Sequence, residues 1–143
     1  MYHGIIVDQE FEDKTFPQRF KTFAQKQSGS WGIYGIEIED ADVNETVKAI
    51  QNNMRSDQAW YAHLYNDTEL LVIFKQKVFR VKPHISTWKP IIEYGRKLNI
   101  PEVQLDFWPN RFQDNLTTFR RRKKYFVPPV FRESAAGLVT VMV

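Results

Sequence analysis

Three histidines are the side chains best suited to acid–base or metal chemistry in this chain. His3 lies near the start of a predicted strand, His63 lies in the middle of another, and His84 lies in a loop. Histidine titrates near neutral pH and is a common metal ligand. An active site would need two of them to converge with a carboxylate. The candidate carboxylates are Asp8, Asp67 and Asp106. The spacing does not require such a convergence, so we expect three unrelated histidines, no catalytic residue, no metal and no cofactor.

Other common catalytic motifs are missing from the sequence. There is no Gly-rich phosphate loop, no Walker lysine loop, no paired-histidine metal helix and no nucleophile elbow. The chain has no cysteine, which excludes disulfides, thiolate catalysis and cysteine-based zinc sites. A small enzyme that uses a His/carboxylate pair is therefore the least favoured of three functional hypotheses.

Tyr61, His63 and Tyr65 share one face of a predicted strand, with Ala62 and Leu64 on the other face. On an open sheet, three such rings could stack single-stranded bases, as RRM-type sheets do. The RRM signature is absent, and the same face could be covered by the core or by a partner.

A second aromatic group, Phe107, Trp108 and Phe112, follows the last predicted helix. Aromatic residues make up 15% of the chain, and exposed rings favour protein–protein contact. We regard the rings of both groups as candidates for binding a protein partner or a second copy of the chain, with closure of the core as the alternative.

The positive charge is concentrated at the C-terminal end. Residues 1–110 hold 13 Lys/Arg and 15 Asp/Glu, whereas residues 111–143 hold 7 and 2. Five basic residues are consecutive: Arg120, Arg121, Arg122, Lys123 and Lys124. A basic run beside aromatic residues can bind phosphates and stack bases, although such a run is commonly a solvated tail. Single-stranded RNA or DNA binding through this run and the Tyr61/His63/Tyr65 face is the second hypothesis.

Hydrophobic periodicity predicts an α+β fold. The expected strands are residues 2–8, 31–39, 59–66, 69–75, 78–82 and 103–107. The expected helices are residues 15–27, a helix that starts after Asp42 and carries Val43 to Met54, and one that starts at Ser86 or Thr87 and stops at Asn99. This order predicts a ferredoxin-like split β-α-β layout, a mostly antiparallel sheet with the helices on one face, preceded by a strand and a helix. We expect residues 1–114 to form a single α+β domain and residues 115–143 to form a basic C-terminal extension.

Three stretches carry a family resemblance: HGIIVD (3–8), YAHLYNDTELLVIFKQKVFRV (61–81) and STWKPIIEYGRKLNIPEVQLDFWPNRF (86–112). Over about residues 1–114 they resemble a family of small, uncharacterised bacterial proteins. The resemblance implies a bacterial or phage source and a soluble cytosolic protein, and it implies no catalytic residue.

A non-catalytic domain that binds a protein partner or self-associates is the first hypothesis, because it requires no catalytic constellation and suits the aromatic content. No apolar run approaches the roughly 18 residues of a membrane span, and the N-terminal residues lack the features of a signal peptide. We therefore expect no membrane partner and a cytoplasmic location, with which the lack of cysteine is compatible.

Overall fold

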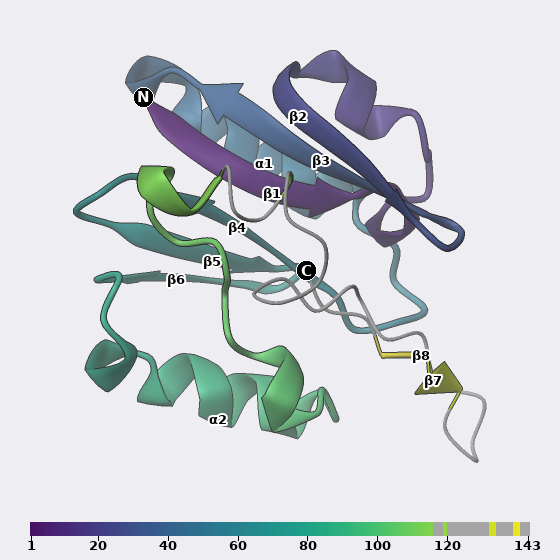
Figure 1. Cartoon of the computed structure of the whole chain (residues 1–143). Coiled ribbons are helices and arrows are strands. Elements are labelled where there is room, and N and C mark those ends of the chain that lie inside the picture. The colour runs from purple at the N-terminus through teal and green to yellow at the C-terminus, as the bar shows by residue number, and fades with distance from the viewer. Residues whose placement is uncertain (116–118, 120–131, 134–138, 141–143) are drawn as a thin grey trace.

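The computed structural model describes residues 1–115, 119, 132–133 and 139–140 (Figure 1). The strands are β1 (Tyr2–Val7), β2 (Lys21–Ser28), β3 (Trp31–Ile38), β4 (Tyr61–Tyr65), β5 (Leu70–Phe74), β6 (Lys77–Val81), β7 (Arg132–Glu133) and β8 (Val139–Thr140). The helices are α1 (Val43–Asn53) and α2 (Lys89–Lys97). Short 3₁₀ helices occupy connections, at η1 (Asp8–Glu10), η2 (Phe16–Arg19), η3 (Asp40–Asp42), η4 (Ile85–Thr87), η5 (Glu102–Gln104) and η6 (Phe112–Asp114). In the described part of the chain, no helix is long and apolar enough to cross a membrane.

Six strands form one open antiparallel sheet in the order β2-β3-β1-β4-β5-β6. The first strand of the chain therefore lies inside the sheet, with Gly4 paired to Ile36 on one side and to Leu64 on the other. Because β3 and β4 both run antiparallel to β1, they are parallel to each other, and α1 makes the crossover between them. This crossover is a split β-α-β unit.

The two helices lie on opposite faces of this sheet (Figure 1). Phe79 and Arg80 are neighbours in β6, so their side chains point to opposite faces. Phe79 contacts Tyr94 of α2, with ring centroids 5.5 Å apart. Arg80 donates a hydrogen bond to Asn44 of α1 at 3.2 Å. The prediction that both helices cover one face is wrong, because every residue of β4 and β5 is buried and the apolar residues on both faces need cover.

The helix predicted over residues 15–27 is also wrong. Only Phe16–Arg19 is helical, as a 3₁₀ turn, and Lys21–Ser28 forms the edge strand β2. β2 and β3 make a hairpin in which Ser28 pairs with Trp31. Gly29 in the turn has a φ of 60°, a left-handed conformation that suits a tight hairpin. Pairing with β3 therefore overrides the weak helical spacing of the phenylalanines.

The last expected strand, residues 103–107, is absent. Glu102–Gln104 is a 3₁₀ turn, and Phe107 has a φ of 52°, which no strand residue adopts. The apolar Val103 is 80% exposed and pairs with no strand. Without this strand there is no second split β-α-β unit, and the observed strand order does not confirm the ferredoxin-like layout. The other expected strands and helices are confirmed within a few residues, including the end of α2 before Asn99, whose φ is 64°.

Close packing between α2 and the segment that follows it depends on Gly95. A Cβ at this position would lie 2.7 Å from Cδ1 of Leu105 and 2.9 Å from its Cδ2. Leu105 is buried, so its methyl groups have little space into which to move.

Gly95→Ala should lower the free energy of unfolding by about 1–3 kcal/mol through overpacking, although alanine is the better helix former. Chemical denaturation measures this change. Lys97→Ala, at an exposed position of the same helix, is the control and should change stability by less than about 0.5 kcal/mol. In the Leu105→Ala background, Gly95→Ala should cost less than in the native chain. A stabilised Gly95→Ala protein would contradict the packing described here.

Candidate functional site

Residues 104–115, here called the strap, cover one face of β4. On that face the hydroxyl of Tyr61 donates a hydrogen bond to the backbone oxygen of Gln104 at 2.6 Å. Nε2 of His63 lies 2.7 Å from the backbone oxygen of Pro109. A carbonyl oxygen can only accept, so Nε2 of His63 carries the proton. The strap thus follows the strand and receives one hydrogen bond from each of these two rings.

The third ring of the strand, Tyr65, bonds the end of the strap. Its hydroxyl donates to Oδ1 of Asn115, and Nδ2 of Asn115 donates to Nδ1 of His3 at 2.5 Å. Burial raises the pKa of the Tyr65 hydroxyl far above its ordinary value, so the hydroxyl remains a donor. The His3 ring lies between two phenyl rings, with centroids 4.4 Å from Phe23 and 4.3 Å from Phe112. One asparagine therefore joins β1, β4 and the strap.

The aromatic side chains of the strap itself close the core. Phe107 is fully buried and packs edge-on against Tyr61 and against Trp88, with centroids 5.2 and 5.1 Å away. Trp108 and Phe112 are half-buried. The candidate rings of β4 and of the strap therefore pack within the molecule, and base stacking on β4 would require displacement of the strap.

His63 is uncharged at neutral pH. Complete burial lowers its pKa to about 4, and the hydrogen bond to Pro109 only partly opposes this effect. Its second ring nitrogen, Nδ1, is buried without a hydrogen-bond partner among the described residues. Such a ring suits a structural role, because protonation would place an unpaired charge in the core.

The three histidines do not form a catalytic or metal site in the described residues. His3 and His63 lie on either side of Tyr65, with ring centroids 6.2 and 5.7 Å from it, and His84 lies in the loop before η4. None of the three is hydrogen-bonded to a carboxylate in the described part of the chain, which also holds no cluster of metal-ligating side chains. The basic run Arg120–Lys124 lies outside the described residues.

The open edge at β6 is not among the sites predicted from the sequence. β6 pairs with β5 over all five residues without a register shift, and no hydrogen bond from another described segment reaches its outer side. A hollow of about 340 Å³ lies at this edge. Its lining consists of Glu69, Arg80, Val81, Lys82 and Thr87. The basic residues interspersed among apolar ones in KQKVFRVK (75–82) are the signal that indicates a basic edge strand.

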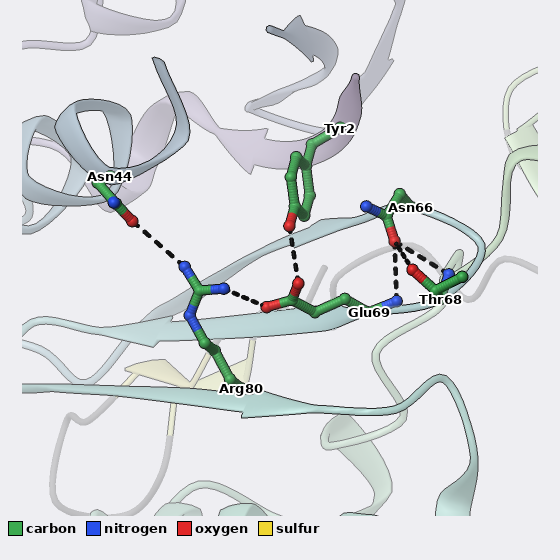
Figure 2. Close-up of polar contacts among 6 residues, drawn as sticks. All are labelled: Tyr2, Asn44, Asn66, Thr68, Glu69 and Arg80. Atoms are coloured by element: carbon green, nitrogen blue, oxygen red, sulfur yellow. Dashed lines mark hydrogen bonds and ion pairs between the residues drawn. The ribbon is translucent and has the colours of Figure 1, made fainter. Parts of the chain in front are cut away.

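A polar network fixes the side chain of Arg80 beside this hollow (Figure 2). The two oxygens of Glu69 accept hydrogen bonds from Arg80 and from the hydroxyl of Tyr2, the latter at 2.8 Å. The guanidinium of Arg80 also donates to Asn44. Tyr2, Asn44 and Arg80 come from β1, α1 and β6, and Glu69 directly precedes β5, so the network joins four elements. The side chain of Arg80 is nevertheless 52% exposed, and it can still meet a ligand.

Comparisons of the chain with protein-family models, with curated proteins and with solved structures find no match. The resemblance of residues 1–114 to small bacterial proteins stays a prediction, and the function is inferred from geometry alone.

The buried His63 should make the protein less stable in mild acid. Its folded pKa of about 4 lies below the ordinary value of 6.5, so between these values the unfolded chain binds a proton that the folded chain does not. The free energy of unfolding should therefore fall as the pH drops below 6.5, by up to about 1.4 kcal/mol per pH unit.

His63→Gln keeps a donor for the oxygen of Pro109 but does not titrate. Denaturation curves from about pH 7 to pH 5 should show a shallower decline for this variant than for the native chain. Other buried acids, such as Glu10, titrate equally in both proteins, so the difference between the curves reports His63. Parallel curves would show that His63 does not carry the pH dependence.

The predicted domain boundary after residue 114 can be tested by truncation. Asn115 bonds Tyr65 and His3, and the ring of Phe119 packs edge-on against Phe23 at 5.7 Å. A chain of residues 1–119 should melt close to the full chain. A chain of residues 1–114 should be less stable by about 1–3 kcal/mol, because the buried hydroxyl of Tyr65 loses its acceptor. Equal melting temperatures for the two truncated chains would contradict a structural role for these residues.

Proposed function

We propose that this protein is a non-catalytic protein-binding domain that adds an extended strand of its partner to the open edge of β6. The observation that supports this proposal is a regular edge strand whose outer side receives no hydrogen bond from the described residues. Unpaired N–H and C=O groups on such an edge are a template for another strand.

The pairing geometry indicates which backbone groups face outward. Two residues, Lys75 and Gln76, connect β5 to β6, so Phe74 and Lys77 flank a tight turn and form a pair. The residues that flank such a turn share hydrogen bonds with each other, and every second residue then points its backbone groups away from the partner strand. This alternation turns the N–H and C=O groups of Val78 and Arg80 toward the open edge.

The other edge of the sheet suits strand addition less well. The register between β2 and β3 shifts between Thr22 and Ala24, which marks a bulge. Bulges twist an edge and interrupt its hydrogen bonds, and they are a common protection against further pairing. One face of the sheet is covered by α1, and the other is covered by α2 and the strap. Of the two edges of the described sheet, β6 is therefore the more regular one for pairing with another strand.

Single-stranded nucleic-acid binding is less favoured by this geometry. The rings that would stack bases are buried beneath the strap, and the basic run Arg120–Lys124 lies outside the described residues. An enzymatic function has no support from the positions of the histidines.

Selection of peptides from a displayed random library against the full chain tests strand addition. Val78→Pro removes an outward N–H without removing a bond to β5, whereas Val78→Thr keeps the N–H and suits a strand. Selected peptides should bind the native chain and Val78→Thr alike, and Val78→Pro should weaken binding by about tenfold or more.

Equal thermal melts for the two variants serve as the folding control. Peptides that bind Val78→Pro as well as the native chain would overturn strand addition at β6. A concentration-dependent dimer of the native chain that Val78→Pro disperses would identify the occupant of this edge as a second copy instead of a different protein.

A further inference from the structure

We infer that the β6 edge selects partner strands rich in aspartate and glutamate. This inference rests on the proposed strand addition and names the chemical class of the partner. Residues 75–84 contain Lys75, Lys77, Arg80 and Lys82 and no acidic residue. Four basic side chains along one short edge strand and its turn give a partner strand a strong charge preference.

Two of these cations are free to pair with a ligand. Lys77 and Lys82 are exposed, and neither forms an ion pair with another described residue. The ammonium of Lys77 lies 5.5 Å from the ring centroid of Phe79, which keeps it near the strand. Lys75 is different, because its Nζ donates to the backbone oxygens of Gln51 and Met54 at the end of α1.

The basic side chains of this edge lie on both sides of the sheet plane. Side chains alternate along a strand, so Lys77 shares a face with Phe79, while Arg80 and Lys82 point to the opposite face. A strand paired with β6 therefore meets a cation on each of its own faces. Acidic side chains at neighbouring positions of the partner, one on each face, would both find a basic residue.

Arg80 is held in place before any partner arrives. Glu69 and Asn44 fix its guanidinium, and half of the side chain remains exposed beside the hollow of about 340 Å³. A fixed guanidinium loses little conformational entropy on pairing with a carboxylate. Lys82 also lines the hollow, so we expect the hollow to receive an acidic side chain of the partner.

The same charges disfavour a second copy of this chain at the edge. Pairing of two β6 strands would bring the basic side chains of both copies to one interface. Like charges across a strand pair are destabilising. The edge therefore favours an acidic strand of another protein over self-association.

The experiment uses three peptides of about ten residues in which pairs of neighbouring glutamates, glutamines or lysines are separated by pairs of threonines, so that the charged residues occupy both faces of the strand. Fluorescence anisotropy measures their affinities for the full chain at low and high salt. Amide hydrogen exchange by NMR reports whether the outward amides of Val78 and Arg80 become protected. A full-length variant at positions 120–124, with Arg120→Gln, Arg121→Gln, Arg122→Gln, Lys123→Gln and Lys124→Gln, removes attraction by the basic run.

The glutamate peptide should bind about tenfold more tightly than the glutamine peptide at low salt, and the lysine peptide should bind more weakly than either. High salt should reduce this preference. The double variant Lys77→Gln/Lys82→Gln should remove most of the preference. The matched control Lys14→Gln/Lys48→Gln has the same net charge and changes exposed lysines elsewhere, so it should retain the preference. The variant at positions 120–124 should also retain it.

Two results would overturn the selection of acidic strands while leaving strand addition intact. One is equal binding of the glutamate and glutamine peptides with protection of the β6 amides. The other is protection of these amides together with a glutamate preference that disappears only in the variant at positions 120–124. If none of the peptides, and none selected from the library, protects the β6 amides, the proposed function fails as well.

Discussion

Three polar rings on one buried face of β4 are the constraint on which the rest of this structure depends. Tyr61, His63 and Tyr65 bring two hydroxyl groups and an imidazole into the core, where an unpaired polar group costs about 1–3 kcal/mol. The strap gives each ring a hydrogen-bond partner. The path of residues 104–115 thus depends on three acceptors that match the spacing of the rings on β4, in addition to apolar contacts.

The location of the strap limits where function can lie. With the strap and α2 on one face and α1 on the other, the described sheet offers its edges for binding. The bulge in β2 makes that edge irregular, whereas β6 pairs regularly and carries free cations. The aromatic residues that first suggest a binding surface pack inside the molecule, and we propose instead that a partner binds at the basic strand β6.

Local sequence pattern predicts the elements whose side chains have one clear preference. The apolar run of β5, the alternation of β3 and the stripe of Val43, Val47 and Ile50 on α1 each indicate the correct structure. β2 is not predictable in this way, because its Lys, Thr and Gln residues fit either structure and only pairing with β3 decides between them. The strap has no periodicity, and its position depends on hydrogen bonds between residues about 40 to 50 positions apart. The candidate rings could be identified from their spacing, but their internal partners could not.

The central position of β1 affects how the sheet can form while the chain is being synthesised. Among the strands of the sheet β1 is synthesised first, and both of its neighbours, β3 and β4, follow later in the chain. Its side toward β4 has no pairing partner until residue 65 has emerged, and the bond between His3 and Asn115 forms later still. Such distant pairings slow folding, and one side of β1 stays unpaired until β4 has been synthesised.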